Sequence, residues 1–165
     1  MLKSFLFVCA FLASMPPSGS GQATVRVEAE TLQGPRPLQE QTGKAAIRDY
    51  LQSWQRFNGA FEQNRTDMLD PFFVGTARDK LAAAIQQQAL AGISTRYVDR
   101  AHDIKIVFYS PDGLSIEMTD SVDYDVQLLD HGKVKTQQHV RSRYVIVLTP
   151  AEVQWRVRVF QAEPD

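Results

Sequence analysis

Residues 114–128 read LSIEMTDSVDYDVQL, and this stretch decides the fold. Apolar side chains recur at every second position and share one face with a single charged residue, Asp120. Since successive side chains of a strand point to opposite faces, the pattern predicts a β-strand with one face in the core and the other in solvent. The core face holds Leu114, Ile116, Met118, Asp120, Val122, Tyr124, Val126 and Leu128.

The same two-residue alternation continues on both sides of this stretch. It predicts one strand that ends near Tyr109, before the turn SPDG at 110–113, and two more strands after the turn DHG at 130–132. A three-residue loop at the second turn places Asp123 opposite His139 on the solvent side. Sequential strands joined by short turns predict an antiparallel arrangement.

A helical period precedes the strands. Between Lys44 and Gln63 the large apolar residues recur every three or four positions, which is the spacing of one face of an α-helix. A second segment with helical spacing follows Gly75 and ends near Gly92. We therefore predict an α+β domain, with N-terminal helices packed on a curved antiparallel sheet of three to five strands. The first helical face holds Ile47, Tyr50, Leu51, Trp54, Phe57 and Phe61.

The first 23 residues have the layout of an export signal. Lys3 precedes an apolar run over residues 4–13, and small and turn-forming residues follow. The run is about half of the roughly 20 residues that a membrane-spanning helix needs. We expect a signal peptide over residues 1–23, or alternatively a poorly ordered terminus, and no membrane span after cleavage. Residues 24–43, with GPRP at 34–37, predict a flexible linker, and residues 44–165 the domain of an exported protein, periplasmic or secreted.

The composition argues against several partners and chemistries. The formal net charge of −1 offers no basic footprint for nucleic acid or an anionic membrane. The single cysteine, Cys9, lies in the predicted signal, so we expect neither a disulfide nor a cysteine nucleophile in the mature chain. The histidines, His102 at a strand start, His131 and His139, lack the spacing of metal ligands. We expect no metal and no other cofactor.

The layout resembles the nuclear-transport-factor-two-like (NTF2-like) superfamily, the curved-sheet cone that ketosteroid isomerase shares with many binding proteins. The features that carry the resemblance are YLxxW at 50–54, the helical segments at 68–70 and 77–81, and the closing strand VQWRV at 153–157. Within that superfamily the layout is most similar to the intermembrane-space domain of plastid-division proteins, which also pairs an early helix Trp with a Tyr-x-Val strand and a final Trp. The resemblance implies a fold more than a function, because this fold hosts enzymes and adaptors alike.

Asp120 is the first candidate site residue. A carboxylate on a core face is costly unless it is paired or lies in a wet cavity, where burial would raise its pKa toward that of a general base. Alternatively, a bulge turns Asp120 to solvent, or it pairs with Tyr144 or an arginine. The aromatic side chains around it would line a cavity for a small apolar ligand, or alternatively only fill the core. The pocket candidates are Tyr50, Trp54, Asp120, Tyr124, Tyr144 and Trp155.

The opposite face of the sheet carries apolar as well as charged side chains. Such a mixture suits a homodimer or partner interface, although an ordinary half-solvated sheet is the alternative. We therefore predict an exported, non-enzymatic interaction or scaffold module that contacts a protein partner or a second copy through this face. The alternatives are a binder of small apolar ligands, and an acid/base enzyme with Asp120 as base and Tyr144 or Tyr50 as hydrogen-bond donor. The interface candidates are Val107, Tyr109, Arg141, Arg143, Val145, Val147, Arg156 and Arg158, and Phe160 is expected beside them.

Overall fold

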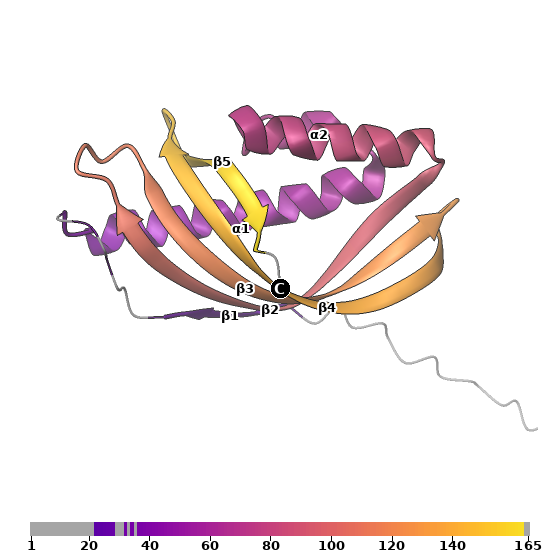
Figure 1. Ribbon diagram of the computed structural model, residues 1–165, viewed down its shortest axis with the longest axis horizontal. Coiled ribbons are helices and arrows are strands. Elements are labelled where there is room, and N and C mark those ends of the chain that lie inside the picture. Colours follow the sequence, from indigo (N-terminus) through magenta and orange to yellow (C-terminus); the bar gives the residue numbers. More distant parts are fainter. Residues whose placement is uncertain (1–21, 29–31, 33, 35, 164–165) are drawn as a thin grey trace, which may run out of the picture.

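The computed structural model of the chain describes residues 22–28, 32, 34 and 36–163. Its strands form one sheet in the order β1-β2-β3-β4-β5. The sheet is curved, α1 lies across its concave side, and α2 lies beyond α1 near β5 (Figure 1). The elements are β1 (Thr24–Val27), α1 (Glu40–Gln63), the 3-10 helix η1 (Thr66–Leu69), α2 (Gly75–Leu90), β2 (Ile93–Tyr109), β3 (Ile116–Asp130), β4 (Lys133–Pro150) and β5 (Trp155–Ala162).

The predicted α+β class and helix-covered curved sheet are confirmed, with a correction at the amino-terminal side. The prediction of a flexible linker over residues 24–43 is wrong for two parts of it. Thr24–Val27 forms β1, which pairs in parallel with residues 101–104 of β2, and α1 begins at Glu40 rather than Lys44. The sheet is therefore mixed and not purely antiparallel. The predicted signal peptide, apart from Gln22 and Ala23, lies outside the described residues.

The hairpin between β3 and β4 is tighter than predicted. Asp130 begins a two-residue turn in which His131 and Gly132 have φ angles of 50° and 75°. Positive φ at both central residues gives the turn geometry that matches the twist of the flanking strands. Together with a bulge, this turn moves the pairing by two residues, so that Asp123 lies opposite Arg141. Because side chains alternate with a period of two, the shift leaves them on their predicted faces.

Two register shifts reverse the faces of two aromatic side chains. In β2 the register shifts after Ile106, which places Tyr109 opposite the core residue Ile116 and buries it. In β5 a similar shift pairs Phe160 with Ile146 of the core. The prediction that Tyr109 and Phe160 lie on the outer face is therefore wrong, since one extra residue in a strand exchanges the two faces beyond it.

Trp54 of α1 fills the centre of the concave side. Its side chain is only 1% exposed, and six aromatic rings surround it with centroids 5.2–6.5 Å from its own. They belong to α1, β2, β3, β4 and β5, so one side chain contacts both layers of the domain. The interior is thus filled, as the core-filling alternative predicts. The six rings are those of Tyr50, Phe57, His102, Tyr124, Tyr144 and Phe160.

The two edges of the sheet differ. The outer edge of β5 is covered, because the N–H of Val157 donates to the carbonyl of Phe72 at 2.8 Å and the N–H of Val74 donates to the carbonyl of Val157 at 2.9 Å. At the other edge, no strand among the described residues lies beyond β1. No helix in the described part of the chain is both long and apolar enough to cross a membrane.

Replacing Trp54 with alanine should lower the free energy of unfolding by about 3–5 kcal/mol, because the deletion leaves a cavity among six rings. Urea unfolding followed by far-UV circular dichroism measures this loss. Val134→Ala, at a side chain that is 47% exposed beside the hairpin turn, is the control and should change the value by less than about 0.5 kcal/mol. Equal unfolding midpoints for the two variants would contradict a close-packed interior.

Candidate functional site

Asp120 lies in a buried hydrogen-bond cluster that joins α1, β2 and β3. The fully buried carboxylate accepts from the Tyr50 hydroxyl at 2.8 Å and contacts Nδ1 of His102 at 2.7 Å. The backbone N–H of Asp103 donates to its second oxygen at 3.1 Å. Three donors thereby satisfy a group that would be costly to bury unpaired. Asp120 is on the core face as predicted, but its partners are Tyr50 and His102 rather than Tyr144 or an arginine.

The contact with Asp120 also orients the ring of His102. The short contact joins Nδ1 to the Asp120 carboxyl group and leaves Nε2 as the second ring nitrogen. His102 is buried in the middle of β2 rather than at the strand start that we expected from the sequence. Its position two residues before Ile104 is the signal that could have placed it on the core face.

The tyrosines of the interior stay neutral. Burial, followed by the charge of Asp120, raises the pKa of Tyr50 well above its ordinary value. Burial, followed by a hydrogen bond with Tyr124, raises the pKa of Tyr144 in the same direction. The hydroxyl oxygens of Tyr124 and Tyr144 are 2.8 Å apart. These groups therefore act as hydrogen-bond donors and acceptors and not as phenolates.

A cleft of about 630 Å³ opens beside the cluster, between α1 and the part of β2 that β1 does not cover. Trp54, Asp99 and His102 are among its lining residues, together with Leu51 and Tyr97. Asp120 does not line the cleft. Of its hydrogen-bond partners, only His102 does. The structure therefore places a histidine, and not the predicted aspartate, at the wall of the cleft.

Asp99 is the carboxylate that the cleft does contain. Asn58 donates to its Oδ2 at 2.8 Å, whereas Oδ1 and the indole N–H of Trp54 make no hydrogen bond within the described structure. Burial raises the pKa of Asp99, and the nearby Trp54, His102 and Asn58 offset this only in part. Strand periodicity did not indicate Asp99, because counting back from Ile104 in steps of two puts it on the outer face. A register shift between Asp99 and Ala101 reverses that assignment.

Five of the six pocket candidates come together, and one does not. Tyr50, Trp54, Asp120, Tyr124 and Tyr144 meet inside the curved sheet. Trp155 instead lies half-buried at the start of β5, where its backbone N–H donates to the Asp49 carboxylate at 2.8 Å. Asp49 is itself buried in α1 and pairs with Arg48 at 2.9 Å.

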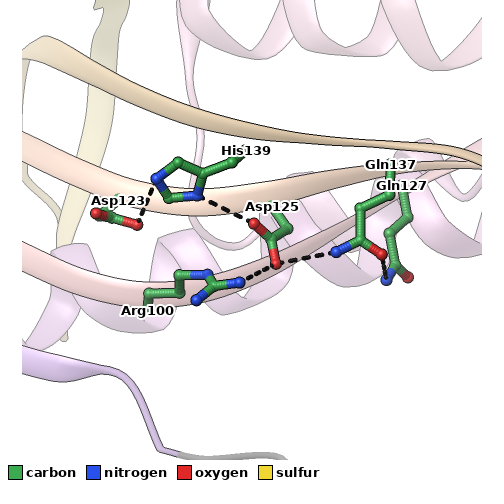
Figure 2. Close-up of polar contacts among 6 residues, drawn as sticks. All are labelled: Arg100, Asp123, Asp125, Gln127, Gln137 and His139. Carbon is green, nitrogen blue, oxygen red and sulfur yellow. Dashed lines mark hydrogen bonds and ion pairs between the residues drawn. The ribbon is translucent and has the colours of Figure 1, made fainter.

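The outer face of the sheet carries a polar cluster around Asp125 (Figure 2). Asp125 accepts from Arg100 at 2.6 Å and from Gln137 at 3.2 Å, and its Oδ1 lies 3.1 Å from Nδ1 of His139. Arg100 first, and His139 second, lower the pKa of Asp125 against the effect of burial. His139 also lies 3.6 Å from Asp123. Acidic and basic side chains on this face are thus paired with one another.

The interface candidates do not form one continuous patch. Tyr109 is in the core, and Arg156 donates to the backbone carbonyl of Asp70 over the covered edge of β5. Arg143 pairs with Glu163 at 3.1 Å. The others are half-buried or exposed, and they are Val107, Arg141, Val145, Val147 and Arg158.

No protein-family model and no curated protein matches this chain. Solved structures do match it. The intermembrane-space region of the chloroplast protein ARC6 superposes with a TM-score of 0.64 at 12% identity, over 79% of this chain and 100% of that one. A candidate dehydratase of the NTF2-like family from Streptomyces avermitilis superposes with a TM-score of 0.52 at 10% identity, over 74% and 97%. This chain has an NTF2-like fold.

A candidate scytalone dehydratase from Novosphingobium aromaticivorans superposes with a TM-score of 0.53 at 13% identity, over 76% of this chain and 89% of that one. The predicted resemblance to this superfamily, with a layout like that of the intermembrane-space domain, is confirmed. At such identities the comparison shows the NTF2-like fold alone. No group of three or more metal-ligating side chains was found among the described residues.

Replacing Asp120 with alanine should lower the free energy of unfolding by about 3–5 kcal/mol, because Tyr50 and His102 then stay buried without their shared acceptor. Tyr50→Phe removes one hydrogen bond and keeps the ring, so it should cost about 1.5–3 kcal/mol. Urea unfolding of both variants gives the comparison. A loss for Asp120→Ala no larger than that for Tyr50→Phe would show that the carboxylate does not join the three elements.

Asp99→Asn should change how stability depends on pH. Because the pKa of Asp99 is raised in the folded state, the folded chain binds this proton more tightly than the unfolded chain does. Wild-type stability therefore falls as pH rises from the ordinary value of 3.8 through the folded pKa, and Asn lacks this loss. The stability of Asp99→Asn relative to wild type should therefore rise with pH above the ordinary pKa of 3.8 in urea titrations.

Asp112→Asn is the control of opposite sign for this experiment. Hydrogen bonds from Ser110 and from the N–H of Leu114 lower the pKa of Asp112, so wild type gains stability from Asp112 as pH rises. The relative stability of Asp112→Asn should therefore fall with rising pH. The same slope for both variants would contradict the environment assigned to Asp99.

Proposed function

We infer that this chain is an exported, non-enzymatic interaction module whose recognition surface is a groove along α1. One observation carries the proposal: Trp54 fills the concave interior, whereas the exposed Val25 and Val27 line cavities just outside it. A filled interior offers no chamber for a substrate. Exposed apolar surface concentrated in one place is typical of a binding site.

The α1–β1 groove, as we name it, consists of two cavities that lie end to end along α1. The cleft of about 630 Å³ and a neighbouring cavity of about 530 Å³ share Leu51 and Gln55 as lining residues. The second cavity lies between the first half of α1 and Val27 of β1. From Lys44 to Glu62 the groove follows about 27 Å of helix, at 1.5 Å per residue.

The wall formed by β1 is apolar and open. Val25 and Val27 pair with His102 and Ile104, so they point toward α1 on the concave face of the sheet. They nevertheless remain 44% and 51% exposed. Walls that stay half exposed describe an open groove rather than an enclosed pocket. A groove of this shape suits a segment of protein better than a small molecule, which a pocket usually surrounds.

The outer sheet face, which we predicted as the interface, is less suitable. Its charged groups around Asp125 are paired within the chain, and Tyr109 is not on that face. The groove instead presents apolar side chains without such pairing. The ARC6 region lies in an intermembrane space and shares this layout over its whole length, which supports a domain that works after export.

Acid/base catalysis is the second candidate function, and one observation favours it. His102 lines the cleft while Asp120 holds its Nδ1, so Nε2 could accept a proton and a protonated Asp99 could donate one. Asp120 would then position His102 rather than serve as the base. Proton exchange at the α-carbons of a panel of ketones, followed by NMR in D₂O, tests this candidate. Catalysed exchange that His102→Gln abolishes would support it, and no exchange would remove it.

A photo-crosslinking residue at position 27 should capture a protein. With p-benzoylphenylalanine in place of Val27, irradiation of native host cells should give one discrete adduct on a denaturing gel, because position 27 faces the groove. The same residue at position 134, which is similarly exposed but distant in the hairpin, is the control. Adducts at 134 but none at 27, or only a small molecule retained in native mass spectrometry, would contradict the proposed function.

A further inference from the structure

We propose that the occupant of the α1–β1 groove is an extended segment of a partner protein that adds to the edge of β1 as a further strand, with an acidic residue at the Lys44 end. This inference rests on the proposed function and names its partner class. It combines three observations: the hydrogen-bonding groups at the edge of β1, the apolar wall of α1, and the charge at one end.

The edge of β1 presents backbone groups without a described partner. The N–H of Glu28 donates to the carbonyl of Ile104, so the even-numbered residues of this strand direct their backbone groups toward β2. Backbone groups of a strand alternate in direction, and those of Val25 and Val27 therefore point to the open edge. No described strand covers them, whereas residues 72–74 cover the opposite edge of the sheet. An exposed edge of this kind is a template for an additional strand.

The apolar wall of α1 fixes which side chains an added strand would bury. In a strand beside β1, alternate side chains point toward α1, as those of Val25 and Val27 do. There they would meet Ile47 and Leu51, which line the groove and are only half-buried. The groove length of about 27 Å accommodates about eight extended residues. The partner segment would therefore carry apolar residues at every second position.

Charge distinguishes the two ends of the groove. Lys44 and Arg48 line the cavity beside Val27, and their side chains are 74% and 61% exposed. Each has one acidic neighbour: Glu40, which is also exposed, and Asp49, which is buried and already bound by the N–H of Trp155. At the opposite end, Glu62 and Arg96 pair with each other at 2.7 Å. An acidic residue of the partner is therefore complementary to the Lys44 end alone.

A lipid acyl chain fits the observations less well than a peptide. An acyl chain with a carboxylate would match the apolar walls and the two cations. It would, however, cover the backbone groups of Val25 and Val27 without replacing their hydrogen bonds to water, which is costly. An added peptide strand satisfies those groups. The observations therefore favour the peptide, and the acyl chain becomes an outcome of the test.

Two ten-residue peptides test the proposal on the protein of residues 22–163. Both alternate valine and threonine, and one ends in Asp-Glu and the other in Lys-Lys. NMR titration should show the acidic peptide shifting the amide signals of Val25, Val27 and Leu51, with binding about tenfold tighter than that of the basic peptide. Amide exchange at Val25 and Val27 should slow on binding, because their N–H groups gain acceptors. A double variant, Lys44→Glu with Arg48→Glu, should reverse the preference between the peptides.

N-methylation of the acidic peptide separates strand addition from apolar contact without altering the protein. Methyl groups on the alternate nitrogens that face β1 should weaken binding about tenfold, because they remove the ladder hydrogen bonds. Methyl groups on the other alternate set should have little effect. Val27→Pro gives the matching change in the protein, because it removes an edge N–H in a conformation that an edge strand tolerates.

Each other outcome overturns the proposal. Equal effects of the two methylation patterns would exclude strand addition, and binding of sodium laurate without any peptide binding would assign the groove to an acyl chain. If crosslinking at position 27 captures a protein but neither peptide binds, the proposed function stands and this inference fails. If both experiments are negative, the proposed function fails as well.

Discussion

The carboxylate of Asp120 sets a constraint on which the rest of the fold depends. It is fully buried, and its hydrogen-bond partners come from α1 through Tyr50 and from β2 through His102 and the backbone of Asp103. A buried carboxylate that lost one of these donors would be costly, so helix and sheet have a single favourable alignment. Packing of Trp54 between the same elements then follows from that alignment. The hydrogen bonds of Asp120 and the packing of Trp54 thus hold the same two layers together, the helix α1 and the sheet.

Because the interior is filled, the open surface of the domain lies outside it. A curved sheet covered by a helix can enclose a chamber, but here aromatic side chains occupy the space between them. The surface that stays open lies where β1 covers only four residues of the much longer β2. The short length of β1 is therefore as important to the groove as the residues that line it. His102 connects the two regions, because one side of its ring faces the buried cluster and the residue also lines the cleft.

Much of the fold could be predicted from the sequence, because periodicity reports directly on burial. The alternation around Asp120 gave the correct core face, and the three- and four-residue spacing around Trp54 gave the correct helix. The predicted sheet faces are wrong beyond bulges, at Asp99, Tyr109 and Phe160. One inserted residue reverses the alternation of side chains, and no single residue type signals a bulge. The strand Thr24–Val27 was missed because its partner lies far along the chain, and a four-residue alternation beside GPRP is too short to show pairing. The site prediction depended on these same positions. It therefore placed the site at the buried Asp120 rather than at the cleft that Asp99 and His102 line.

The parallel pairing of β1 has a consequence for the order of assembly. Thr24 is made early in synthesis, yet its partner Ala101 follows only after both helices have been added. Pairing between residues far apart in the chain requires closing a long loop, which costs conformational entropy before any contact forms. We therefore expect β1 to join a sheet that already exists. Gln22 and Ala23 then reach the mouth of the cleft. A purification tag fused directly ahead of them would lie at the α1–β1 groove and leave the core untouched, so under the proposed function a tagged protein can be well folded and still unable to bind its partner.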